Sequence, residues 1–152
     1  MPEIAIEPEN IAELALELGR AMNEMKSRLR QQIRVKVSAY DPDLSFELLE
    51  IIGLLWRRDG INQQEIAEIV SKDKSSVTYL INSLVKRGLV KRVEDKNDRR
   101  NRLVFLTPKG RQKRKVIFPW VLELYQQAAG DTGSDEIRNA IALVKQMTAN
   151  LG

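Results

Sequence analysis

Residues 61–90 read INQQEIAEIVSKDKSSVTYLINSLVKRGLV, and this stretch decides the expected fold. Asn62, followed three residues later by Glu65, resembles a capping box with Asn as the cap, and it predicts a short helix. Asp73 can accept hydrogen bonds from the free amides of a second helix, which we expect over residues 74–87. A short helix, a tight turn and a longer helix are typical of a helix-turn-helix, although an αα-hairpin in any helical protein has the same pattern.

The second helix of this pair has an apolar side and a polar side. The apolar side, which we expect to face the core, consists of Val77, Leu80, Ile81, Leu84 and Val85. The polar side and its edges carry hydroxyl, amide and basic groups, on Lys74, Ser75, Ser76, Thr78, Tyr79, Asn82 and Lys86. Such groups bond base edges and phosphates, so we predict that this side of the helix contacts duplex DNA.

Two segments of strand-like composition follow, at residues 89–93 and 102–106, joined by EDKNDRRN. The joining segment is too polar for a core, which predicts a hairpin with a charged tip. Arg99 and Arg100 are long enough to enter a minor groove, and Asp98 can brace one guanidinium. With Lys96 and Asn97 they form the predicted wing contact, and a solvated hairpin loop is the alternative.

Residues 44–115 resemble the winged helix of the MarR-type regulators, the multiple-antibiotic-resistance regulator family. The most specific segments are SSVTYLINSLVKRGLVKR, NDRRNRLVFLT and the PKG that follows. The resemblance implies that the helix at residues 74–87 enters a major groove and that Arg100, oriented by Asp98, enters the minor groove. The family commonly has Arg after the Thr of this helix, whereas this chain has Tyr79, so the base preference there is open.

The segments around the winged helix are predicted to be helical. Apolar residues recur every three or four positions from about Pro8 to Val37, which indicates a long helix ended by the turn at 41–43. We expect Ser45 to cap a helix before the helix-turn-helix. Beyond the hairpin, the predicted features are a cap at Thr107, a helix from Pro108, a kink or break at Pro119, a loop at 130–133 and a last helix capped by Ser134.

The expected fold class is therefore mainly α, an α+β winged helix-turn-helix with a two-stranded wing hairpin and long terminal helices. We expect one MarR-like domain over residues 1–152, with the DNA-binding region at 44–107. The resemblance implies that the helical regions at 9–40 and 108–152 interlock with a second copy to form a homodimer. Two heads about 34 Å apart would then read a pseudo-palindrome in successive major grooves.

Composition argues against catalysis and metal binding. The chain has neither His nor Cys, which removes the commonest general base, the commonest transition-metal ligand, disulfides and thiol redox switches. The glycines do not cluster as a nucleotide cradle requires. An enzyme would have to work with carboxylates or lysines, so we expect no enzymatic activity, no cofactor and no metal.

Basic charge is concentrated in the middle of the sequence. Residues 57–115 hold 17 Lys or Arg against 7 Asp or Glu, whereas the rest holds 8 against 14. This asymmetry favours a polyanionic partner, with a solvated basic face as the alternative. The sequence has no long apolar run, and MPEIAIEPEN lacks the features of a secretory signal, so we expect a cytoplasmic protein without membrane contact.

We predict a sequence-specific, double-stranded DNA-binding transcription regulator, a repressor acting as a homodimer. Members of the family often respond to a small aromatic effector, and the candidate pocket residues here are Met22, Met25, Tyr40, Trp56 and Trp120. Met and aromatic residues on apolar helix faces more often belong to a core. The alternative function is a winged-helix protein-interaction module without DNA specificity.

Overall fold

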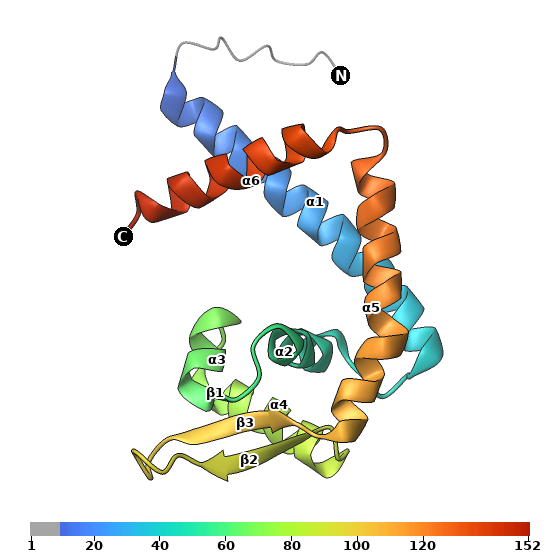
Figure 1. Ribbon diagram of the computed structural model, residues 1–152, viewed down its shortest axis with the longest axis vertical. Coiled ribbons are helices and arrows are strands. Elements are labelled where there is room, and N and C mark those ends of the chain that lie inside the picture. The colour runs from blue at the N-terminus through green and yellow to red at the C-terminus, as the bar shows by residue number, and fades with distance from the viewer. Residues whose placement is uncertain (1–9) are drawn as a thin grey trace. The chain divides into compact units, whose positions relative to one another are not determined.

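A computed structural model describes residues 10–152 (Figure 1). The predicted beginning of the first helix at Pro8, and residue 9 of the predicted dimerisation region, lie outside the described residues. The chain divides into two compact units, residues 1–120 and 121–152, and each is described by itself. The elements in chain order are α1 (Ile11–Tyr40), α2 (Phe46–Arg57), β1 (Ile61–Asn62), α3 (Gln63–Ile69), α4 (Lys74–Lys86), β2 (Val90–Glu94), β3 (Arg102–Leu106), α5 (Pro108–Ala129) and α6 (Ser134–Ala149).

Side-chain caps fix where the helices of the first unit begin. Ser45 accepts a hydrogen bond from the amide of Leu48, and Asn62 accepts one from the amide of Glu65 at 2.7 Å. Asp73 accepts from the amide of Ser76, and the Thr107 hydroxyl accepts from the amide of Gly110. These four predicted caps are confirmed. Helix α1 ends at Tyr40, directly before the predicted turn at 41–43.

The core of the winged helix is aliphatic. Its fully buried side chains come from α2, α3, α4, the strands and α5, and are Ile51, Ile52, Leu55, Ile66, Val77, Ile81, Leu84, Leu89, Val90, Val104 and Ile117. One predicted core residue is wrong, because Val85 is 38% exposed. The buried side of α4 follows Val77, Ile81 and Leu84, and the residue after Leu84 lies about 100° further around the helix.

The predicted wing hairpin is confirmed as β2 and β3, which pair antiparallel from Val90 opposite Leu106 to Glu94 opposite Arg102. A third strand, β1, pairs with β3 through Ile61 opposite Val104, giving the order β1-β3-β2. This strand was not predicted, because two residues are too few to show an alternating pattern. Figure 1 shows the hairpin extending beyond the helices of the winged region.

For the later helices, the predicted break at Pro119 and the predicted cap at Ser134 are wrong. Helix α5 does not break at Pro119 and continues as one helix from Pro108 to Ala129. The folded chain therefore tolerates the unfavourable free energy of a proline in a helix interior. Helix α6 begins at Ser134, but Ser134 is not its cap. Gly133 has the extended cap conformation and no side chain to donate or accept a bond.

The second unit, residues 121–152, contains the end of α5, the turn at 130–133 and α6. No residue of α6 is buried, and Ile137, Ile141 and Leu143 are 38%, 50% and 50% exposed. Within residues 10–152, no helix is both long and apolar enough to span a membrane.

Candidate nucleic-acid interface

The predicted recognition helix α4 presents a polar side to solvent. Six of its seven predicted contact residues are exposed, namely Lys74, Ser75, Ser76, Tyr79, Asn82 and Lys86. The phenol of Tyr79 is the most prominent, since this residue is 74% exposed. The positive charges stand at the two ends of the helix, and the residues between them offer hydroxyl and amide groups. This is a surface that can read base edges by neutral hydrogen bonds.

Thr78, the seventh predicted residue, is half-buried and already bonded within the protein. Its hydroxyl donates to the carbonyl oxygen of Lys74 at 2.9 Å and accepts from Nε2 of Gln63 at 2.5 Å. The Oε1 atom of Gln63 in turn accepts from Nε of Arg92 at 3.3 Å. The three side chains therefore join α4, α3 and β2 in one hydrogen-bonded chain.

The wing tip is a folded turn. Asp95 donates its amide to the carbonyl of Asn101, and the amide of Asn101 donates to the carbonyl of Asp98 at 2.9 Å. The Asp95 carboxylate accepts the amide of Asn97. The predicted wing residues Lys96, Asn97, Asp98, Arg99 and Arg100 are all exposed.

Asp98 plays a different part from the predicted one. Its carboxylate accepts the backbone amide of Arg100 at 3.0 Å, and among residues 10–152 it forms no ion pair with an arginine. The short side chain of an aspartate reaches the backbone amide two residues ahead more easily than it reaches a guanidinium. The hydrogen bond to that amide forms an Asx turn. Asp98 thus shapes the turn that carries Arg100 and leaves the guanidinium exposed.

Basic residues at the start of α5 are engaged inside the protein. Lys109 donates to the carbonyl of Arg87 at 3.1 Å, and Lys113 lies 3.2 Å from the Asp41 carboxylate. Arg87, the C-cap residue of α4, also pairs with Asp41 at 3.1 Å. Burial alone would raise the pKa of Asp41, but the Lys113 hydrogen bond and the Arg87 charge outweigh it and hold that pKa below its ordinary value. This cluster ties α1, α4 and α5 together.

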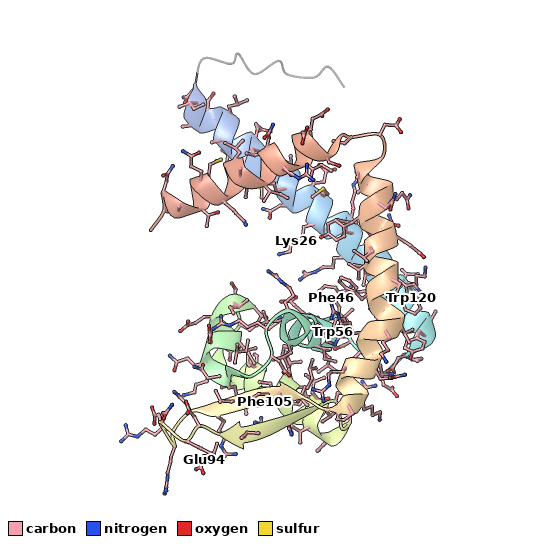
Figure 2. The ribbon with its side chains drawn as sticks, viewed as in Figure 1. Lys26, Phe46, Trp56, Glu94, Phe105 and Trp120 are labelled. Atoms are coloured by element: carbon pink, nitrogen blue, oxygen red, sulfur yellow. The ribbon has the colours of Figure 1, made fainter. Side chains whose placement is uncertain are left out.

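The candidate effector residues differ in their contacts and in their exposure. The rings of Tyr40 and Trp120 meet edge to face at 5.5 Å, while Nε1 of Trp56 donates to the carbonyl of Gly110 at 3.1 Å. Met22 and Met25 are 39% and 51% exposed on α1. Figure 2 labels Trp56 on α2 and Trp120 on α5. A separate cavity of 210 Å³ lies between α1 and the first turn of α2, and Arg34, Val37 and Phe46 are among its lining residues.

Comparison with known proteins assigns the region that carries this interface. Residues 44–101 match the model of the MarR family. The winged-helix region of this chain is therefore similar to the MarR family. The MarR match runs from the residue before the α2 cap to the wing tip, so it includes every predicted DNA-contact residue.

The similarity to known transcriptional regulators extends over most of the chain. Transcriptional regulator HosA of Escherichia coli O157:H7 is 24% identical over 128 residues, which are 82% of this chain and 95% of HosA. A MarR transcriptional regulator from Methanosarcina mazei Go1 has a TM-score of 0.75 at 25% identity, covering 89% of this chain and 98% of that one. A MarR-family regulator from Listeria monocytogenes, solved with a 26mer DNA, shares the fold with a TM-score of 0.73 at 21% identity, covering 87% of each chain.

Proposed function

We propose that this chain is a transcription regulator that binds duplex DNA as a homodimer, with α4 in the major groove and the wing tip in the adjacent minor groove. The observation that carries the proposal is the exposed hydroxyl and amide surface of α4 beside an arginine-bearing wing tip, on a MarR-family winged helix. In this proposal Ser75, Ser76, Tyr79 and Asn82 read bases or phosphates, and Arg100 enters the minor groove. The DNA complex of the Listeria regulator supports it by analogy of fold.

Lys74, Lys86 and Arg99 would supply electrostatic anchoring around these contacts. Thr78 has a different role, because its hydroxyl is already used by Lys74 and Gln63. It holds α4 against α3 and so fixes the surface that its neighbours present. Lys96 and Asn97 lie in the exposed wing turn, where they can reach the DNA backbone.

The homodimer is supported by apolar side chains left in contact with solvent. Helix α1 exposes Ile11, Leu14 and Leu16 by 79%, 49% and 54%, and α6 exposes Ile141 and Leu143 by half. Side chains of this kind, repeated along helices, are typical of surfaces that another chain covers. We therefore assign residues 9–40 and 108–152 to dimerisation and 44–107 to DNA binding, with two heads on a pseudo-palindromic operator.

A dimer bound over a promoter would repress by occupancy. A small aromatic effector would relieve repression only by binding better to an arrangement of the heads that does not fit the operator. The pair of Tyr40 and Trp120, with Met22, Met25 and Trp56, remains the proposed place for such a ligand.

Selection from a randomised duplex pool tests the proposal. The purified chain is expected to enrich one pseudo-palindrome, to bind it with two chains per duplex, and to lose affinity steeply as salt rises. Failure to enrich any sequence, together with negligible duplex binding at physiological salt, would contradict it. Salt-insensitive capture of a protein partner by the same α4 surface would instead establish the interaction-module alternative.

A further inference from the structure

The hydrogen-bonded chain from α4 to β2 ends in a guanidinium that is only partly used. Nε of Arg92 donates to Gln63, and among residues 10–152 the terminal nitrogens of Arg92 have no hydrogen-bond or ion-pair partner. The Gln63 amide is oriented by both neighbours, because its oxygen faces the Arg92 donor and its nitrogen faces the Thr78 hydroxyl. Arg92 is therefore held at its base while its fork of N–H donors stays available.

A second cation lies close to Arg92 on the same side of the hairpin. Arg92 pairs in register with Val104, and Arg102 is two residues before Val104 on β3, which places both arginines on the side that carries the buried Val90, Val104 and Leu106. Burial, and after it the charge of Arg102, lower the pKa of Arg92. The positive charges of two neighbouring guanidinium groups repel each other, and an anion placed between them stabilises both.

No carboxylate among residues 10–152 supplies that anion. Glu94 is opposite Arg102 in the β2–β3 register, yet neither Arg92 nor Arg102 forms an ion pair among the described residues. Figure 2 labels Glu94 on the part of β2 near the wing tip. The pair of Arg92 and Arg102 can therefore bind an anionic ligand from outside the chain.

The position of the pair indicates which anion it takes. Arg92 is bonded through Gln63 to Thr78 of α4, and it lies on a strand of the wing. If α4 occupies a major groove and the wing tip the neighbouring minor groove, one phosphodiester backbone must pass between them. A guanidinium fixed between the two elements meets that backbone.

We propose that Arg92, positioned by Gln63 and accompanied by Arg102, is a phosphate clamp on the DNA strand that passes between α4 and the wing. This inference rests on the proposed function. The clamp takes a phosphodiester and reads no base, so it sets the register of the domain along the duplex. It adds to the predicted contact residues, none of which is Arg92 or Arg102.

Fluorescence anisotropy on one duplex over a salt series tests the clamp, using the full chain. Arg92→Gln is expected to weaken binding by about tenfold or more at fixed salt. It should also reduce the slope of log K against log salt by about 0.9 for each phosphate that is no longer neutralised, or about twice that for two bound chains. Arg92→Lys keeps the charge and should keep the slope, although its affinity falls because it lacks the fork.

Matched variants separate the outcomes. Arg138→Gln removes one charge from α6, outside the DNA-binding region, where the side chain is 73% exposed. Once sedimentation shows that its oligomeric state matches the wild type, this variant should change neither slope nor affinity by more than about twofold. If Arg92→Gln keeps the wild-type slope while Arg100→Ala still weakens binding, the clamp is refuted and the proposed function stands. If the unsubstituted chain binds no duplex, both are refuted. Should Arg92→Gln lose its fold by circular dichroism, Arg102→Gln, at an exposed strand end, gives the same slope test.

Discussion

Replacing Gly110 with alanine should destabilise the protein, although alanine is the better helix former. Gly110 lies in the first turn of α5, and a Cβ built there would be 2.2 Å from the carbonyl oxygen of Leu89 and 3.1 Å from a methyl group of Leu106. The Leu89 carbonyl is backbone, and it also accepts the amide of Thr107 at 3.1 Å. The first turn of α5 would have to move by about 1 Å to restore an ordinary contact distance.

The expected cost follows from what that movement disturbs. Overpacking of this kind costs about 1 to 3 kcal/mol. Stretching the hydrogen bonds that join Thr107 to Leu89 and Gly88 adds about 1 to 2 kcal/mol to this cost. The higher helix propensity of alanine offsets about 1 kcal/mol of it. The net loss in the free energy of unfolding is therefore about 1 to 4 kcal/mol.

Urea denaturation at fixed protein concentration measures this loss, with tryptophan fluorescence as the probe. Trp56 is a suitable reporter because its Nε1 donates to the carbonyl of Gly110. Gly53→Ala is the matched control, since Gly53 lies inside α2 and a Cβ there meets nothing within 4 Å. It should be neutral or stabilise by up to about 1 kcal/mol. Equal stability of the two variants would refute the packing argument.

Three further predictions concern other parts of the first unit. Asp41→Asn should cost about 2 kcal/mol near neutral pH, because Arg87 and Lys113 lose their shared anion. Since the pKa of Asp41 is lowered on folding, this contribution is fully present above its ordinary value of 3.8 and is lost as pH falls through the lowered pKa. Urea titrations should therefore show a smaller wild-type advantage at pH 3 than at pH 7, and an equal advantage at both pH values would contradict the assignment. Asn62→Ala removes the α3 cap and should cost about 1 kcal/mol by the same titration, with no change counting against the cap. Tyr79→Ala should leave stability within about 0.5 kcal/mol because the side chain is 74% exposed, while weakening the selected duplex in anisotropy; wild-type affinity would exclude Tyr79 from the interface.

Local chemistry accounts for what the sequence could predict. A cap such as Asp73 needs only its own side chain and the amide three residues on, and the wing strands show their strand-like composition within five residues each. The winged helix-turn-helix and its exposed α4 residues were therefore accessible from residue order alone. That composition also placed Arg102 at the beginning of β3, as the structure has it.

Contacts between segments distant in the sequence could not be predicted from it. The hydrogen bond between Arg92 and Gln63 spans 29 residues, and the pair of Arg87 and Asp41 spans 46. No local sequence pattern predicts either contact. Thr78 belongs to the polar side of α4 by spacing, but only the packing of α3 against α4 reveals that its hydroxyl is already bonded. Strand β1 was not predicted for a related reason, since its two residues become a strand only by pairing with β3.

The most direct test of the DNA-binding account is the effect of Arg100→Ala on binding to the selected duplex, measured by anisotropy over a salt series. The account predicts about 10- to 100-fold weaker binding and a shallower salt dependence, with the circular dichroism spectrum and stability of the wild type. Arg138→Gln, the same loss of charge on α6, should bind as the wild type does. Equal affinity of Arg100→Ala and the wild type would contradict the claim that this chain holds DNA with its wing.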